Sequence, residues 1–333
     1  MQNNVMRILT FLHLLQKHTD EKHALTREEL TQLLADAGYE VNRKTFYEYI
    51  KQLQQVGYPI VALKSGNFGY YLISTPFSFA QAKLLVDAVQ TSRVLPKDTS
   101  TELIGKIGSI MSQYESAQLK RKLYLSERPK TINKNIYQHI DKIYEAISSN
   151  RKVSFRYFDW ILNHKQQREK CYRHDGQEYK VSPYSLVWAD DNYYMVAHYP
   201  QHDALSNFRV DRMDLVMICD EKRVPLSEAT QDADFNLPLY SQRLFSMFVG
   251  KTQQVTMLID ADLLSAMLDR FGHHADLKRV NDQIQVSVSL EVSPPFLAWI
   301  FQFKDKIKIV SPKDVQNQYL SHLRSVLTHY KGE

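Results

Sequence analysis

Hydrophobic positions in the first part of the chain recur with the period of an α-helix. The first run has the i, i+3, i+4, i+7 spacing of a helix with one buried face, at Val5, Ile8, Leu9, Leu12 and Leu15. Thr26 followed by Glu29 forms a capping box that opens a second helix, which we expect to end at Gly38. Asn42 caps a third helix, which stops at Gly57 and has as its apolar side Phe46, Tyr49, Ile50, Leu53 and Val56.

Two short strand-like runs follow Pro59, at residues 60–63 and 69–73. The residues between them, 64–68, contain Gly66 and favour a hairpin connection. Three short helices followed by a β-hairpin are the plan of a winged helix-turn-helix. We therefore assign residues 1–75 to a domain of that kind.

Helical spacing returns at residues 79–122 and again at 136–147. Pro96 breaks the first of these stretches, and Thr99 or Ser100 is available to restart the helix. Residues 76–150 are therefore predicted to form a helical connector.

At Lys152 the hydrophobic period changes from 3.6 to about 2, and it stays there until Cys219. Strands are predicted at residues 153–158, 178–182 and 193–199, with turns at 175–176 and 190–192. A compact β domain at residues 151–222 has the size of a small barrel.

The last part of the chain, residues 223–333, alternates strands and helices after a linker-like stretch at 224–234. The order β-α-β-β-α-β, with one added terminal helix, is the ferredoxin-like split βαβ plan. The predicted elements are residues 254–259, 261–271, 277–280, 283–291, 295–302, 307–310 and 312–330. The fold class is therefore α+β, with several domains.

Length, charge and cysteine content narrow the class of protein without indicating a function. The chain has 333 residues, too many for one ordinary core, and its net charge of +5 permits a nucleic-acid partner without requiring one. Residues 118–135 carry six Lys or Arg against one Glu, whereas residues 1–75 carry eight against seven acids. No apolar run approaches the roughly 18 residues of a membrane span. Two cysteines fit a reducing compartment, so we expect a cytoplasmic protein with no membrane association.

Three motifs carry a resemblance to a known family. The segments 45–50, 57–60 and 66–72 look like a recognition helix and wing. Residues 182–186 and 193–197 stand at the place of a Trp-Tyr-Leu strand, and residues 208–213, Phe-Arg-Val-Asp-Arg-Met, look like the arginine-rich element that follows it. Over its full length the chain resembles the WYL-domain transcriptional regulators.

The resemblance implies a barrel related to the Sm and SH3 folds that binds an effector, in several members a nucleic-acid strand, within a DNA-binding homodimer. Two departures stand out. Of the naming triplet only the middle residue, Tyr194, is kept, with Tyr193 and Met195 beside it, and Tyr49 stands where the family usually has an aspartate. Aromatic and apolar replacements preserve the strand, whereas the change at Tyr49 affects how the third helix is braced or which DNA it reads.

The exposed side of the third helix supplies candidate contacts to double-stranded operator DNA. Lys44, Tyr47 and Lys51 form one stripe, with Arg43, Thr45 and Gln54 beside it. An ordinary solvent-exposed helix face would have the same pattern of residues. The spacing of the helices and the presence of the wing favour the interpretation as a DNA-contacting face. Thr26 and Arg27, with Lys64 and Asn67 in the wing, are candidate phosphate contacts, although a simple cap and polar turn residues explain them equally.

Candidate effector contacts lie in the β domain. Arg209 and Arg212 come first, because arginine binds phosphate bidentately and is seldom buried without a partner. Strict alternation would place them on opposite faces, so a shared site requires the strand to end near Val210 or to bulge. Tyr194 stacks on a base or packs in the core, and further candidates, each equally compatible with a solvent-facing position, are Arg156, Ser182 and His198.

The sequence indicates neither a metal site nor a catalytic site. His164, Cys171 and His174 have no standard metal-ligand spacing, and we expect no metal or cofactor. No catalytic motif is present, so we expect a protein that is not an enzyme. We interpret the chain as a homodimeric regulator sensing a single-stranded nucleic acid or nucleotide. The alternative is an accessory protein that binds single-stranded nucleic acid to modulate another machine.

Overall fold

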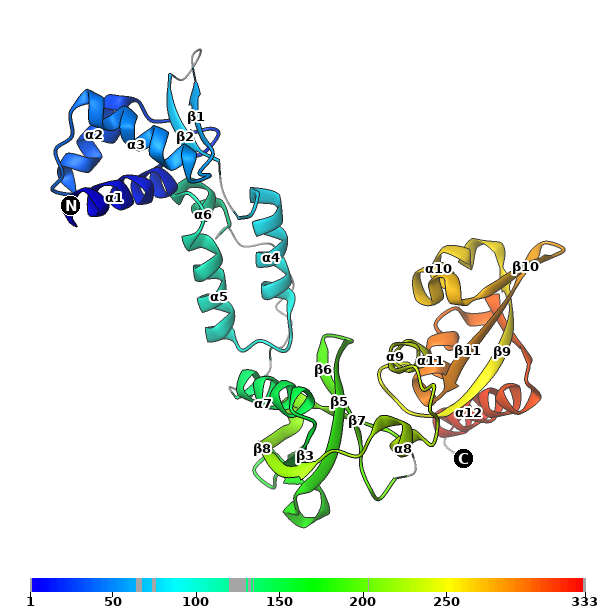
Figure 1. Ribbon diagram of the computed structural model, residues 1–333. Helices are drawn as coiled ribbons and strands as arrows, with labels where there is room; N and C mark the ends of the chain where they lie inside the picture. The colour runs from blue at the N-terminus through cyan, green and yellow to red at the C-terminus, as the bar shows by residue number, and fades with distance from the viewer. Residues whose placement is uncertain are drawn as a thin grey trace. The chain divides into compact units, whose positions relative to one another are not determined.

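The computed structural model describes residues 2–63, 68–73, 76–119, 130, 133, 135–202 and 204–331. Helices and sheets are mixed along the chain (Figure 1). Contacts divide the chain into two compact units, Met1–Ile132 and Asn133–Glu333. Among the described helices, none is long and apolar enough to cross a membrane.

The first unit begins with helices α1 (Gln2–His18), α2 (Arg27–Asp36) and α3 (Arg43–Gln55), followed by strands β1 (Ile60–Leu63) and β2 (Gly69–Leu72). Side chains cap two of the helices as expected. The Thr26 hydroxyl accepts a hydrogen bond from Glu29 N at the start of α2, and Asn42 accepts one from Thr45 N at the start of α3. β1 and β2 pair antiparallel.

Side chains from all three helices and both strands form one core. Its fully buried members include Phe11, Leu15, Leu30, Leu34 and Phe46. The prediction for the apolar face of α1 is wrong at two positions, since Val5 and Leu9 are 56% and 53% exposed. Leu12 and Leu15 of that face are buried as predicted, and Phe11 joins them in the core, because only this side of α1 faces the other helices.

Three further helices complete the first unit: α4 (Phe79–Thr91), α5 (Lys97–Ser109) and α6 (Gln113–Leu119). The break at Pro96 is present, but α5 begins directly after it rather than at Thr99 or Ser100. Proline fixes its own φ near the helical value and lacks an N–H, so it is well suited to the position just before a helix.

The second unit starts with helix α7 (Ile136–Ser148) and a curled antiparallel sheet. The strands are β3 (Arg151–Leu162), β4 (Arg168–Tyr172), β5 (Tyr179–Ala189), β6 (Asn192–His198), β7 (Ser206–Arg209) and β8 (Met213–Lys222). Their order is β4-β3-β5-β6-β7, and β8 pairs with β3. The sheet is a half-barrel, and in the described part of the chain no pairing joins β7 to β8 to close it.

The long strand β3 determines this curl. Its first half pairs with both β5 and β8, and its second half pairs with β4. Aromatic rings of Phe155, Tyr157, Tyr179 and Phe208 pack together on one face, with ring centroids between 5.2 and 6.2 Å apart. Helix α7, which the sequence placed in the connector, packs against β3, β5 and β8.

The stretch 224–234 is not a bare linker, because it contains helix α8 (Leu226–Thr230), whose Ala229 is buried against Tyr184 and Tyr194. Helix α9 (Leu237–Arg243) follows. A second sheet then forms from β9 (Lys251–Asp260), β10 (Asp276–Val280), β11 (Gln283–Val292) and β12 (Ile307–Ser311), in the antiparallel order β10-β11-β9-β12. The accompanying helices are α10 (Leu264–Phe271), α11 (Pro294–Phe301) and α12 (Lys313–Lys331).

Candidate functional site

The two arginines of the predicted effector site lie on one short turn. Strand β7 ends at Arg209, and a 3₁₀ turn, Val210–Arg212, leads into β8. The backbone N–H of Arg209 donates to the Tyr157 hydroxyl at 3.1 Å, which ties the strand end to β3. Side chains alternate between the two faces of a sheet only within a strand, and the strand ends at Arg209. Arg209 and Arg212 therefore do not have to point to opposite faces.

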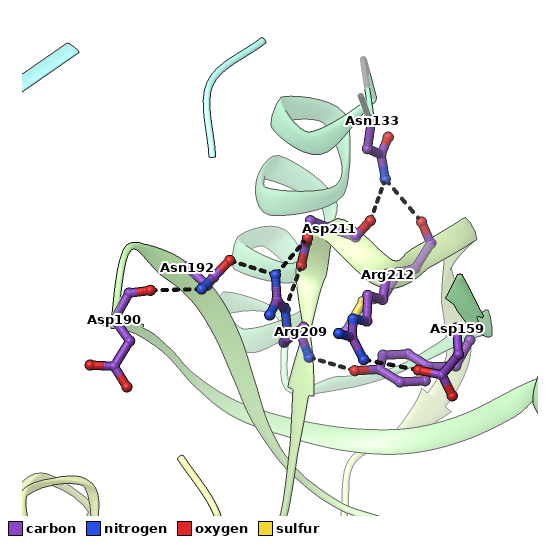
Figure 2. A network of polar contacts seen from close by, with 9 residues as sticks. Asn133, Asp159, Asp190, Asn192, Arg209, Asp211 and Arg212 are labelled. Atoms are coloured by element: carbon purple, nitrogen blue, oxygen red, sulfur yellow. Dashed lines mark hydrogen bonds and ion pairs between the residues drawn. The ribbon is translucent and has the colours of Figure 1, made fainter. Parts of the chain in front are cut away.

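Arg209 is held by acceptors on both sides (Figure 2). Its Nε and Nη2 donate to the two carboxylate oxygens of Asp211 at 3.0 and 2.9 Å, and Nη2 also donates to Asn192 Oδ1 at 2.7 Å. Burial alone would lower the pKa of Arg209, but the hydrogen bonds and charge of Asp211 outweigh it and raise the pKa. The guanidinium is therefore charged and fixed in direction.

Arg212 and Arg173 share one carboxylate. Arg212 Nη1 donates to Asp159 Oδ1 at 2.9 Å, and Arg173 Nε donates to Asp159 Oδ2 at 2.7 Å. The hydrogen bond from Arg173, together with the charges of Arg173 and Arg212, lowers the pKa of Asp159. Arg173 also lies over the Tyr157 ring, 5.2 Å from its centroid.

The three arginines line a cavity of about 920 Å³, which we call the arginine cavity. Its basic residues are Arg173, Arg209 and Arg212, and its aromatic wall includes Tyr157 and Tyr194. The rest of the lining comes from residues 201, 202, 204–207 and 246–249. Tyr194 is 8% exposed and packs against Val196 and Leu205, so it is a core residue that also forms part of the wall.

The other three predicted contacts lie outside this cavity. Arg156 is exposed on β3, opposite Asp214 of β8. Ser182 is buried, and its hydroxyl accepts a hydrogen bond from Val224 N at 3.0 Å, which is a structural role. His198 pairs with Ser182 across β5 and β6, and its buried Nδ1 has no partner among the described residues.

Sequence reasoning missed Arg173 and the segment 246–249. Arg173 lies two residues before the predicted turn at 175–176, and only the fold of β4 back onto β3 brings it to Asp159. Leu244, Phe245 and Met247 are buried, and residues 246–249 also line the cavity. No local pattern in the sequence could have shown this.

One residue outside the sheet supports the turn at residues 209–212, which we call the arginine turn. The side-chain amide of Asn133 donates to the carbonyl oxygens of Asp211 and Met213, at 3.1 and 3.3 Å (Figure 2). Asn133 is the first residue of the second unit. The position of the turn is thus linked to the point at which the chain enters this unit.

A second candidate surface lies on α3. Arg43, Lys44, Tyr47 and Lys51 are exposed there, with Tyr47 42% exposed and Arg43 5.9 Å from the centre of its ring. These side chains stand opposite the buried Phe46, Tyr49, Ile50 and Leu53. The expected separation into a polar and an apolar side is present within α3, but Val56, predicted on the apolar side, lies beyond the last helical residue and is 77% exposed.

Several of the other predicted DNA contacts form bonds within the protein. The Thr26 side chain caps α2, Arg27 pairs with Glu28, and the Thr45 hydroxyl lies 3.1 Å from Asn42 Oδ1. Gln54 donates to the carbonyl oxygen of Ile60 at 2.8 Å, so its amide holds the strand rather than projecting freely. Lys64 and Asn67 lie outside the described residues.

The two departures from the family pattern have structural roles. Tyr49 is 2% exposed, and its hydroxyl donates to Asn4 Oδ1 at 2.9 Å, which braces α3 against α1. Tyr193 meets Trp188 across β5 and β6, with ring centroids 4.7 Å apart. Both residues therefore contribute to packing.

Comparison with known proteins identifies one domain. Residues 138–218 match the family model of the WYL domain, which covers α7 and the half-barrel as far as β8. No curated protein matches the chain.

Two similar solved structures are distant. One is proteasome accessory factor B/C (PafBC) of Arthrobacter aurescens, with a TM-score of 0.28 and 16% identity, covering 96% of this chain. The chain spans only 46% of the length of that protein. The other is a CRISPR Cas-related protein, with a TM-score of 0.37 and 13% identity, covering 90% of this chain and 77% of that one.

Proposed function

We propose that this protein is a transcriptional regulator that binds operator DNA through α3 and senses a nucleic-acid strand or nucleotide in the arginine cavity of its WYL domain. The observation that carries the proposal is the convergence of Arg173, Arg209 and Arg212 on one cavity. Three guanidiniums beside aromatic side chains are the chemistry that binds phosphate groups and bases.

The arrangement leaves donors for a ligand. Two carboxylates, Asp159 and Asp211, offset part of the positive charge and hold the guanidiniums in place. Arg212 uses Nη1 for Asp159, and its remaining N–H groups have no acceptor in the described part of the chain. A phosphate can therefore bind to groups already fixed in direction, which reduces the entropy lost on binding.

DNA binding rests on the first unit. Three helices and a hairpin fit a winged helix-turn-helix, in which α3 enters the major groove. Lys44 and Lys51 are exposed on the polar side of α3, where contacts to phosphates or guanine are available. We further interpret the C-terminal sheet as a ferredoxin-like extension, and the protein as a cytoplasmic homodimer without enzymatic activity.

Coupling between effector binding and DNA binding requires that the effector and the operator each prefer one of two arrangements of the protein. The hydrogen bonds from Asn133 to the arginine turn supply a physical route. A ligand that pulls on Arg209 or Arg212 changes the position of carbonyl oxygens to which Asn133 is bound. That change acts on Asn133, the first residue of the second unit.

The experiment is a footprint on duplex DNA upstream of the protein's own gene, at several salt concentrations, with mass spectrometry of co-purifying nucleic acid. A discrete protected site supports the regulator. Protection without sequence preference, with a co-purified single strand, would instead support an accessory protein that binds single-stranded nucleic acid. Absence of both would overturn the proposal.

A further inference from the structure

A smaller cavity of about 340 Å³ lies elsewhere in the second unit. We call it the second cavity. Its polar lining includes Asp190, Arg243, Arg270 and His274, and its apolar lining includes Leu244 and Phe271. It shares with the arginine cavity only the residues Ser246 and Met247, so the two cavities lie on either side of one turn.

The arginines of the second cavity differ from those of the first in their partners. Arg209 and Arg212 each pair with a carboxylate. Within the described residues, neither Arg243 nor Arg270 forms an ion pair, and the buried Nε of Arg243 has no hydrogen-bond partner. A buried donor without an acceptor costs free energy, unless a ligand supplies the acceptor.

Arg270 is held in a fixed orientation by neutral groups. Its guanidinium lies 3.9 Å from the centroid of the Phe245 ring, and Nη2 donates to the carbonyl oxygen of Leu244 at 2.9 Å. Burial lowers the pKa of Arg270, and the charge of Asp190 opposes that effect. Stacking and a single carbonyl leave most of the five N–H donors of this guanidinium available.

The charges at this cavity favour an anion. The described lining residues include two arginines, Arg243 and Arg270, and one carboxylate, that of Asp190. The volume lies at the lower end of the roughly 300–1,000 Å³ range of small-molecule sites, which suits a ligand the size of a mononucleotide rather than a polymer. A planar guanidinium matches the oxygens of a phosphate monoester.

We propose that Arg243 and Arg270 bind the phosphate of a small phosphomonoester, of mononucleotide size, at a site separate from the arginine cavity. Leu244 and Phe271 provide an apolar wall for the rest of the molecule. The site goes beyond the proposed function, because it is a second ligand site with its own arginines, distinct from the cavity in which the effector is proposed to bind.

The test is calorimetric titration of the full chain with AMP, and separately with inorganic phosphate. We expect one AMP at the second cavity in the parent protein. The variant Arg243→Gln/Arg270→Gln should bind AMP with an affinity lower by about 10-fold or more, since a charge-assisted hydrogen bond is worth roughly a factor of ten in affinity. The variant Arg209→Gln/Arg212→Gln should retain it, and the exposed Arg279→Gln should match the parent.

Three outcomes would overturn the proposal: no AMP binding by the parent at millimolar concentration, unchanged affinity in the folded Arg243→Gln/Arg270→Gln variant, or an equal loss in Arg209→Gln/Arg212→Gln. If circular dichroism shows that the double variant does not fold, Arg243→Lys takes its place. That change keeps the charge but removes the planar fork, and it should still weaken binding of AMP measurably.

Discussion

The side-chain amide of Asn133 bridges the carbonyl oxygens of Asp211 and Met213, and Asp211 in turn binds the guanidinium of Arg209. A residue at the start of the second unit is thus two hydrogen bonds away from the candidate effector site. Arg209 binds the carboxylate of Asp211 and Asn133 binds its carbonyl oxygen, so Asp211 is hydrogen-bonded to both residues.

Replacing Asn133 tests this connection. Asn133→Ala removes the donor to two carbonyl oxygens and should lower the free energy of unfolding by about 1 kcal/mol. It should also reduce the effect of a bound effector on DNA affinity. Urea unfolding and DNA titrations with and without effector check both effects, and Asn135→Ala, an exposed neighbour, serves as control. Full coupling in the Asn133 variant would show that the turn communicates by another route.

The exposed side of α3 gives a prediction for DNA binding. Lys44→Ala and Lys51→Ala should each weaken operator binding without loss of stability, because both side chains are exposed. If they contact phosphates, each change reduces the slope of log affinity against log salt by about one and weakens all sequences alike. Lys308→Ala, exposed on β12, is the matched control. Equal affinity of both variants and parent across a salt titration would rule out α3 as the reading helix.

The arginine turn gives a prediction for sensing. Arg209→Ala/Arg212→Ala should abolish the influence of a phosphate-bearing effector on DNA affinity, since the charge-assisted hydrogen bonds are lost. In the parent, operator DNA must change effector affinity by the factor by which effector changes operator affinity. Calorimetric titration of an effector with and without operator measures both factors. Unchanged effector affinity in the folded variant would place the site elsewhere.

Tyr49 gives a prediction for stability. Tyr49→Phe keeps the buried ring but removes the hydrogen bond to Asn4, which should cost about 0.5–1.5 kcal/mol of unfolding free energy. Tyr49→Asp, which introduces the residue usual in the family, should cost more, because it places a carboxylate at a site that is 2% exposed. Thermal and urea unfolding compare the two variants. No loss of stability in Tyr49→Phe would contradict the bracing role of the hydroxyl, and an equal loss in both variants would contradict the importance of the buried ring.

His139 gives a prediction for pH dependence. It is 4% exposed on α7, and burial lowers its pKa below the ordinary value of 6.5. The unfolded chain therefore binds a proton more readily than the folded one, so this residue's contribution to stability is complete above pH 6.5 and is lost as pH falls below it.

The measurement is urea unfolding of parent and His139→Gln between pH 7.5 and pH 5.5, with the exposed His322→Gln as control. The difference between parent and His139→Gln should change with pH by at most about 1.4 kcal/mol per unit, the limit for one proton. A difference that stays constant over this interval would show that His139 does not titrate between the folded and unfolded states.

Local signals in the sequence determined most of the elements. The capping box of Thr26 and Glu29, the Asn42 cap and the change of hydrophobic period at Lys152 each depend on residues a few positions apart, so the printed order contains them. The arginine-rich segment at 208–213 was recognisable for the same reason. These features are encoded locally because caps and periodicity are properties of single helices and strands.

The tertiary structure alone decided how these parts combine. Arg173, Arg209 and Arg212 meet because β3 pairs along both halves with different strands and because β7 ends at Arg209, so side chains from three segments converge. The same packing left Val5 and Leu9 exposed and separated Ser182 and His198 from the cavity. Sheet curl, register and the place where a strand ends depend on contacts between distant residues, which no local pattern records.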